Sequence, residues 1–138
     1  MSVSIPEDFV DLLNDPVTVT LVTVMPSGQP QATAVWCDYD GENLLINTET
    51  KRQKARNMRD SGKVTVLAID PTKPARYLEV RGTVVGESFD GAEDHIDKLA
   101  NQYAGAKKYF GDYIPEHMRD VQTRVIFTVR PDRVNTKT

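Results

Sequence analysis

Short runs of alternating, largely β-branched residues, separated by turn-forming residues, dominate this 138-residue sequence. Residues of this kind favour strands, and clusters of Gly, Pro, Asn and Asp between them favour tight connections. Strands are expected at residues 17–25, 31–38, 44–48, 64–70, 77–85 and 124–130. The first three follow one another with only short turns between them, which indicates an antiparallel meander. Six or more strands with inserted helices favour a small antiparallel barrel over a doubly wound sheet.

Helical patterns occupy several of the remaining segments, and we expect helices at residues 6–14, 51–60, 90–104 and 115–121. Thr50 and Gln53 have the spacing of a capping box before the second helix, and Asp90 and Glu93 have it before the third. Gly62 follows the second helix where a glycine stop is expected. These helices are therefore predicted to be insertions that pack against a mainly β fold.

Bulk composition is that of an ordinary globular chain. Hydrophobic residues make up 39% and charged residues 27%, and the length suits one domain, residues 1–138. The longest apolar run, residues 17–25, is far shorter than the roughly 20 residues of a membrane-spanning helix. Residues 1–8 lack the basic start and apolar core of a secretory signal. We therefore expect a cytoplasmic protein with no membrane partner.

Several classes of site are disfavoured by what the sequence contains. Cys37 is the only cysteine, so an internal disulfide and a multi-cysteine metal site are excluded, and its place after Trp36 on a strand suggests a packing thiol. His95 and His117 are isolated, one of them on the polar side of a predicted helix, and suggest neither a metal nor a general base. The net charge of −3 argues against general binding to nucleic acid. Any anion site must be local.

A local concentration of positive charge occurs in NTETKRQKARNMRDSGK, residues 47–63. Lys51, Arg52 and Lys54 fall in the first turn of the predicted helix, where the helix dipole disfavours cations by roughly 0.3–1 kcal/mol each. A bound phosphate would reverse that penalty by accepting backbone N–H groups and charged hydrogen bonds. A solvated basic face balanced by Glu49 and Asp60 explains the pattern equally well, so charge pattern alone leaves both interpretations open.

The string QKARNMRD, preceded by LLINTETKR and followed by a predicted strand, resembles the cofactor-phosphate segment of the pyridoxamine 5'-phosphate oxidase-like proteins. The resemblance is strongest to their actinobacterial, coenzyme F420-dependent branch. It extends over TLVTVMPSGQPQATAVWCDYDGENLLI, YLEVRGTVV, LANQYAGAKKYFG and RVIFTVRPDRV, which is nearly the whole chain. It implies an antiparallel split β-barrel of the FMN-binding type, and a homodimer with two cofactor sites at the subunit interface.

Matching positions imply which residues bind the cofactor. They are Arg52 and Lys54 at its phosphate, Asn47 and Thr48 at the end of the third strand, Asn57 in support, and Gln31 and Tyr77 near its ring or side chain. Ala75 stands where some relatives have a tryptophan, which changes the expected substrate face. One phosphate does not need the further cations Arg56, Arg59 and Lys63. They either bind the glutamate tail of F420 or form a solvated helix face.

The function implied by the resemblance is hydride transfer between reduced F420 and a small unsaturated organic substrate. An FMN-dependent oxidoreductase is the nearest alternative, and a non-catalytic flavin- or haem-binding protein is a rival from another class. No catalytic side chain is assigned, because in such enzymes the cofactor performs the redox chemistry while the protein orients it.

Overall fold

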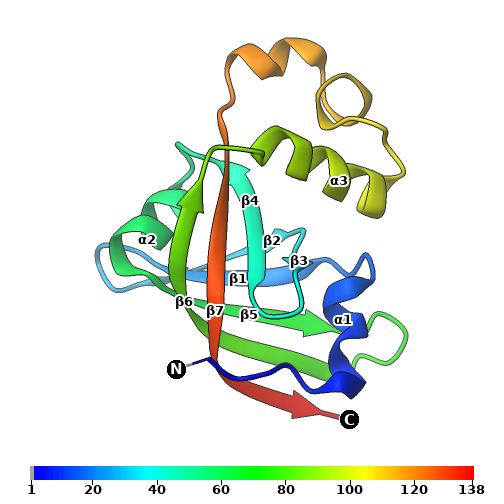
Figure 1. Ribbon diagram of the computed structural model, residues 1–138. Coiled ribbons are helices and arrows are strands. Elements are labelled where there is room, and N and C mark those ends of the chain that lie inside the picture. The colour runs from blue at the N-terminus through cyan, green and yellow to red at the C-terminus, as the bar shows by residue number, and fades with distance from the viewer. Residues whose placement is uncertain (1) are drawn as a thin grey trace.

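A single curled antiparallel sheet forms the body of the protein in a computed structural model, which describes residues 2–138 (Figure 1). Its seven strands are β1 (Val19–Val24), β2 (Pro30–Val35), β3 (Asp38–Tyr39), β4 (Leu44–Glu49), β5 (Lys63–Ile69), β6 (Tyr77–Ser88) and β7 (Arg124–Lys137). They lie in the order β2-β1-β5-β6-β7-β4-β3. The expected mainly β, split-barrel architecture is confirmed.

Alternation along the strands places one set of side chains inside the curl of the sheet. Leu21, Ile46, Val66 and Phe127 come from four different strands and are fully buried there. Burial of each of these side chains stabilises the fold by about 1.5–3 kcal/mol relative to leaving it exposed to water. The period-two pattern in the sequence therefore reports directly which face became the core.

The second predicted strand, residues 31–38, is divided into β2 and β3. The backbone N–H of Cys37 donates to the hydroxyl of Tyr103 at 3.1 Å, and that hydroxyl is also 3.0 Å from the carbonyl oxygen of Cys37. The hydroxyl of Tyr103, from a helix far along the chain, thus takes the place of a neighbouring strand as hydrogen-bond partner of Cys37, and the strand pairing ends here. The chain then turns toward β4.

Strands β6 and β7 run beyond the predicted ends at residues 85 and 130 and pair along most of their lengths. Register shifts occur between Arg81 and Gly82 and between Val84 and Gly86. A Cβ atom on Gly82 would lie 2.5 Å from Cγ1 of Val129, so the two strands approach too closely there for any side chain. These irregularities interrupt the alternation that the prediction used.

Helical segments lie around this sheet: η1 (Glu7–Phe9), α1 (Asp11–Asn14), α2 (Gln53–Ser61), α3 (Ala92–Ala104), the turn η2 (Tyr109–Tyr113) and η3 (Glu116–Asp120). The predicted helix at residues 6–14 is therefore a short 3-10 turn followed by a short α-helix. None of these helices, within residues 2–138, is long and apolar enough to cross a membrane.

Helix ends only partly follow their predicted signals. Gly62 ends α2 in the left-handed conformation, at φ 70°, and donates its N–H to Met58, as predicted. Both capping boxes were wrong: α2 is capped by Arg52 and α3 by Gly91, and neither has a side-chain cap. Gln53 instead donates to the Asn57 side chain one turn later, at 2.8 Å.

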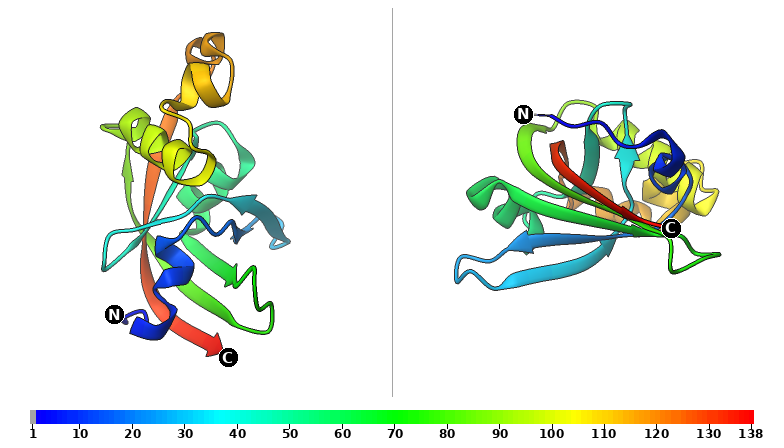
Figure 2. Two further views of the ribbon diagram at one scale, coloured as in Figure 1. Left: turned by 90° about the vertical axis from the view of Figure 1, so that its right-hand side faces the viewer. Right: turned by 90° about the horizontal axis from the view of Figure 1, so that it is seen from below.

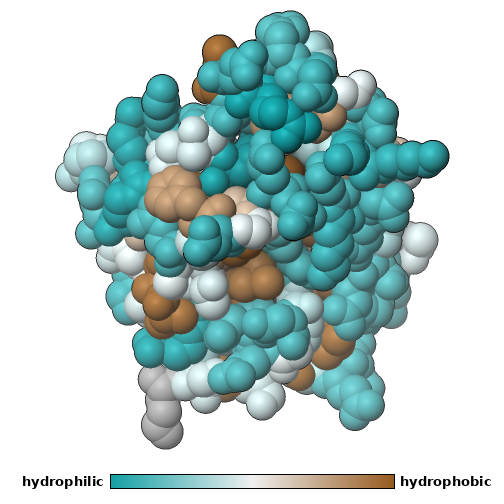
Figure 3. All heavy atoms as spheres, turned by 45° about the horizontal axis from the view of Figure 1, so that its top comes forward, coloured by the Kyte–Doolittle hydropathy of each residue, from teal (hydrophilic) through white to brown (hydrophobic). Residues whose placement is uncertain are grey.

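Helix α3 and the turns that follow it cover one end of the sheet, while α2 lies beside it (Figures 1 and 2). Beneath α3 is a second, smaller core of Ile96, Leu99, Ala100, Tyr109 and Phe110. With that end turned forward, the surface is mostly hydrophilic, with hydrophobic patches gathered near its middle (Figure 3). The upper ends of β4 and β7 therefore lie between two packed helical units.

Candidate functional site

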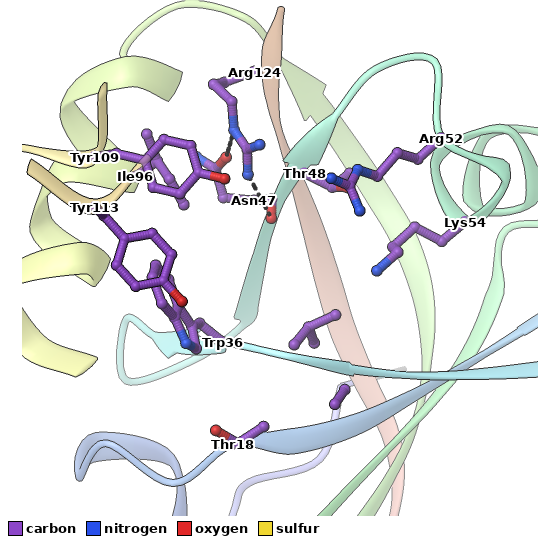
Figure 4. A pocket seen from close by; sticks show the side chains of 12 residues that line it. Thr18, Trp36, Asn47, Thr48, Arg52, Lys54, Ile96, Tyr109, Tyr113 and Arg124 are labelled. Carbon is purple, nitrogen blue, oxygen red and sulfur yellow. Dashed lines mark hydrogen bonds between the residues drawn. The ribbon is translucent and has the colours of Figure 1, made fainter. Parts of the chain in front are cut away.

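A pocket of about 290 Å³ lies where β4 ends, between the start of α2 and the α3–η2 unit (Figure 4). Its polar and charged lining residues are Thr18, Asn47, Thr48, Arg52, Lys54 and Arg124, and its aromatic ones are Trp36, Tyr109 and Tyr113. Four of the seven residues implied to bind a cofactor thus line one cavity: Asn47, Thr48, Arg52 and Lys54.

The turn between β4 and α2 positions the two predicted phosphate ligands. Glu49 is 7% exposed, and its carboxylate accepts the backbone N–H of Lys51 at 2.9 Å and that of Thr123 at 3.1 Å. This carboxylate therefore ties the turn to the start of β7. With the turn fixed, Arg52 and Lys54 point toward the pocket from one side (Figure 4).

Positive charge in the pocket has no counter-charge in direct contact. Among residues 2–138, no carboxylate lies within 4.0 Å of the charged nitrogens of Arg52, Lys54 or Arg124. Burial lowers the pKa of Lys54, and the nearby charges of Arg52 and Arg124 lower it further. A cation cluster held together at this electrostatic cost would be stabilised by a bound anion.

Arg124 was missed by sequence reasoning because nothing in its neighbourhood on β7 marks it as a ligand. It is 8% exposed, and burial lowers its pKa. Its Nε donates to Oδ1 of Asn47 at 3.0 Å and its Nη1 to Gln122 at 2.8 Å. The guanidinium also lies over the ring of Tyr109, 4.8 Å from the ring centroid. These contacts fix its plane at the pocket wall.

Asn47 has a fully used side chain. Besides accepting from Arg124, it donates to the carbonyl of Ala92 at 2.8 Å and contacts Nδ1 of His95 at 3.1 Å. An amide with these partners has little capacity left for a ligand. Asn47 therefore lines the pocket chiefly as the group that orients Arg124.

The sequence suggested that His95 is isolated on a polar helix face, but in the structure both of its ring nitrogens have partners. Its Nε2 lies 3.0 Å from Oδ2 of Asp38, which also accepts from Lys98 at 2.9 Å. Burial alone would raise the pKa of Asp38, but the hydrogen bonds from His95 and Lys98 bring it down to about 2. A hydrogen-bonded chain therefore runs from Asp38 through His95 and Asn47 to Arg124.

Asn57 and Gln31 lie in a separate polar network rather than on the pocket wall. Asn57 is 1% exposed, and it donates to the hydroxyl of Thr23 at 3.0 Å. That hydroxyl donates to Gln31 at 3.3 Å. The network fastens α2 to β1 and β2, so its direct effect is on the position of the helix that carries Lys54.

Tyr77 opens β6 and pairs there with Ile69 and Lys137. It is not among the residues that line the pocket. The structure therefore does not bring Tyr77 to the other predicted ligands within one chain.

Two of the surplus cations, Arg59 in α2 and Lys63 at the start of β5, have partners outside the pocket. Arg59 forms an ion pair with Glu87 at 2.7 Å and donates to Thr50 at 3.0 Å. Lys63 donates to Thr83 at 3.1 Å. This pairing weakens the idea that both hold an anionic cofactor tail.

Comparison with known proteins identifies the family to which this fold belongs. A family model described as pyridoxamine 5'-phosphate oxidase matches residues 5–138. The chain belongs to the pyridoxamine 5'-phosphate oxidase family. Among solved structures of this fold, an F420 reductase is 38% identical with a TM-score of 0.81, over 95% of this chain and 98% of that one. No curated protein matches this family member significantly.

Two other solved structures share the fold with this family member. A conserved hypothetical protein from Mycobacterium tuberculosis is 24% identical, with a TM-score of 0.67, over 99% of this chain and 86% of that one. HupZ from Group A Streptococcus is 20% identical, with a TM-score of 0.68, over 96% and 93%. At these identities the similarity shows the fold alone.

Cys37 and Trp36 have different roles in this family member. Cys37 is fully buried, which raises the pKa of its thiol to about 12 and keeps it from acting as a nucleophile. Trp36 packs at the pocket, with its ring 5.4 Å from that of Tyr103 and 4.9 Å from that of Tyr113. The tyrosines of YFGDY could have been found as a local cluster of aromatic residues.

Proposed function

We propose that this chain is an F420-dependent oxidoreductase that acts on a small unsaturated organic molecule. The observation that carries the proposal is the pair Arg52 and Lys54, which faces a pocket without a carboxylate partner in residues 2–138. The 38% identity to an F420 reductase, over 95% of the chain, supports the choice of cofactor.

The donors around the pocket fit a phosphate. Arg52 and Lys54 supply charged N–H groups, and Thr48 adds a hydroxyl from the adjacent end of β4. Arg52 is also the N-cap of α2, whose first turn contains no acidic residue. An anion there gains from the free N–H groups and the dipole of the helix. In this proposal the three residues hold the cofactor phosphate.

Bound in this way, a reduced deazaflavin supplies a hydride equivalent to its substrate. The contribution of the protein is to fix the cofactor, to orient the substrate and to keep water away from the reacting atoms. No side chain in the pocket is assigned a proton-transfer role in this proposal.

A homodimer is part of the proposal. The cavity of one chain, about 290 Å³, lies just below the range of small-molecule sites, which is roughly 300–1,000 Å³. One chain therefore encloses only part of a cofactor, and a second copy would complete the wall. Tyr77, which is away from the pocket of its own chain, would reach a cofactor only from that second copy.

FMN is the second candidate cofactor, because it also presents a phosphate and the family model carries the name of pyridoxamine 5'-phosphate oxidase. His95 is a poor haem ligand, because its two ring nitrogens are both engaged by Asp38 and Asn47. Among residues 2–138, no group of three or more His, Cys, Asp or Glu could hold a metal ion.

The cofactor is tested by titrating the purified protein separately with F420, FMN and haem. Trp36 is the only tryptophan and lines the pocket, so its fluorescence reports occupancy directly. The proposal expects saturable quenching by F420 at lower concentration than by FMN. Tighter binding of FMN would move the assignment to a flavin enzyme, and quenching by haem alone would replace it with a haem-binding protein.

A further inference from the structure

The pocket has two chemically different sides. Arg52 and Lys54 come from the start of α2 on one side, while Trp36, Tyr109 and Tyr113 form the other (Figure 4). Arg124 lies between them, against the aromatic group (Figure 4). We propose that the aromatic side, with Arg124, binds the substrate, and that the substrate is a flat, conjugated carboxylate. This inference rests on the proposed function and names its substrate class.

Arg124 has hydrogen-bonding capacity that its protein partners do not use. A guanidinium has five N–H donors, and the acceptors of Arg124 in residues 2–138 are Oδ1 of Asn47, Oε1 of Gln122 and, at 3.5 Å, the Asn47 carbonyl. Two N–H groups therefore have no protein acceptor within 3.5 Å, although the Tyr109 side chain also interacts favourably with the guanidinium. Because the residue is 8% exposed and lines the pocket, an anion in the pocket is the partner that fits them.

The direction of the guanidinium is set by residues that themselves have little freedom. Asn47 is held by the Ala92 carbonyl and by His95, and His95 is held by Asp38. The Tyr109 ring supports one face of the guanidinium at 4.8 Å. A planar, pre-oriented fork of this kind suits the two oxygens of a carboxylate better than a single point charge would.

Aromatic rings next to this guanidinium provide a surface for a flat ligand. Tyr113 stacks on Tyr109 with their ring centroids 5.7 Å apart and meets Trp36 edge to face at 4.9 Å. Tyr113 is nevertheless 49% exposed, so much of its surface is not used in packing. The turn that carries it contains Gly111 at φ 107°, and Tyr113 lines the pocket. A conjugated ligand would cover this exposed area.

The chemistry is consistent with a conjugated acid. Reduction would break the π bond of the substrate C=C: the β-carbon would gain a hydride from reduced F420, and the α-carbon would gain a proton from solvent. The oxidised cofactor would return a proton to solvent, so the two-electron step balances. As the hydride arrives, negative charge spreads from the α-carbon onto the carboxylate. Arg124 would stabilise that charge through its two free N–H groups.

The test compares matched ligands on the wild-type protein by isothermal titration calorimetry, with and without saturating F420. trans-Cinnamate is the probe, cinnamamide removes the charge while keeping the shape, and crotonate keeps the acid while removing the ring. We expect cinnamate to bind about tenfold or more tightly than cinnamamide, as a charged hydrogen-bonded pair requires, and more tightly than crotonate. Because all three ligands are titrated into the wild-type protein, the result does not depend on whether a variant folds.

Two variants then assign the effect to residues. Arg124→Gln should remove the preference for cinnamate over cinnamamide, and Arg124→Lys should restore only part of it, because the planar fork is lost. Tyr113→Leu should weaken cinnamate and cinnamamide together while leaving crotonate unchanged. The F420 affinity of Arg124→Gln, measured separately, should fall far less than that of Arg52→Ala/Lys54→Ala if Arg52 and Lys54 hold the cofactor phosphate.

Other outcomes separate this inference from the proposed function. Equal affinity for cinnamate and cinnamamide in the wild type would overturn the inference. Loss of F420 binding in Arg124→Gln would also overturn it, since Arg124 would then belong to the cofactor site. If the protein binds no F420 but keeps an Arg124-dependent preference for the acid, the proposed function fails and the carboxylate site stands.

Discussion

The side-chain amide of Asn47 holds the guanidinium of Arg124, with Oδ1 of the amide 3.0 Å from Nε of the arginine. The same amide joins β4 to α3 through the Ala92 carbonyl and His95. One side chain thus connects three elements at the wall of the pocket, and its removal should affect both stability and ligand binding.

Asn47→Ala is expected to lower the free energy of unfolding by about 1–3 kcal/mol, because it leaves buried donors and acceptors without partners. Urea denaturation measures the change. Asn43→Ala, in the turn before β4, is the control: Asn43 is half-buried and only its backbone is hydrogen-bonded, so the change in stability should be less than about 0.5 kcal/mol. Similar effects of the two substitutions would show that the Asn47 contacts add nothing to stability.

Asp38 should make the protein sensitive to acid. Its pKa is about 2 in the folded state against 3.8 ordinarily, so its ionised form is favoured by folding. The stability it contributes is fully present above pH 4 and is lost as the pH falls through about 2. In Asp38→Asn, the loss of stability between pH 4 and pH 2 should be smaller than in wild type. Asp15→Asn, which removes an exposed carboxylate, should leave the wild-type slope unchanged; equal slopes for Asp38→Asn and wild type would refute the assignment.

Gly82 should tolerate no side chain, whereas Gly86 on the same strand should. A Cβ atom on Gly82 would lie 2.5 Å from Val129 Cγ1 and 2.7 Å from the carbonyl oxygen of Arg130, while the nearest atoms to one on Gly86 are 3.5 Å away. Gly82→Ala is expected to destabilise the protein by about 1–3 kcal/mol, and Gly86→Ala to have a much smaller effect. Thermal unfolding of the two variants in parallel makes the comparison. An equal Tm for both would contradict the close approach of β6 and β7.

Much of the fold could be predicted from the sequence because alternation marks a strand that has one buried face. The core positions Leu21 and Val66 follow that pattern directly. Strand ends were predicted less well, since β6 and β7 continue through bulges at Gly82 and Gly86, where the alternation shifts. The division of the second strand depends on the Tyr103 hydroxyl, which comes from a helix far along the chain.

The same distinction applies to the site. Arg52 and Lys54 lie in one local motif, so a single segment was enough to bring them to notice. Arg124 reaches the pocket through the pairing of β4 with β7, and His95 reaches Asn47 through the packing of α3. Nothing near either residue in the sequence indicates its partner. Contacts of this kind are set by tertiary structure and are not visible in charge pattern or spacing.

The central claim, that Arg52 and Lys54 hold the cofactor phosphate, is tested most directly by a matched pair of double variants. Arg52→Ala/Lys54→Ala removes two charges that line the pocket. Lys51→Ala/Arg56→Ala removes two charges from the same segment at exposed positions outside the lining. Titration with F420, followed by Trp36 fluorescence, gives the affinity of each.

We predict that the first variant loses affinity by about a hundredfold or more, as two charged hydrogen-bonding groups require, while the second stays close to wild type. Equal losses in the two variants would mean that only general positive charge is needed, and would contradict a phosphate site built by Arg52 and Lys54.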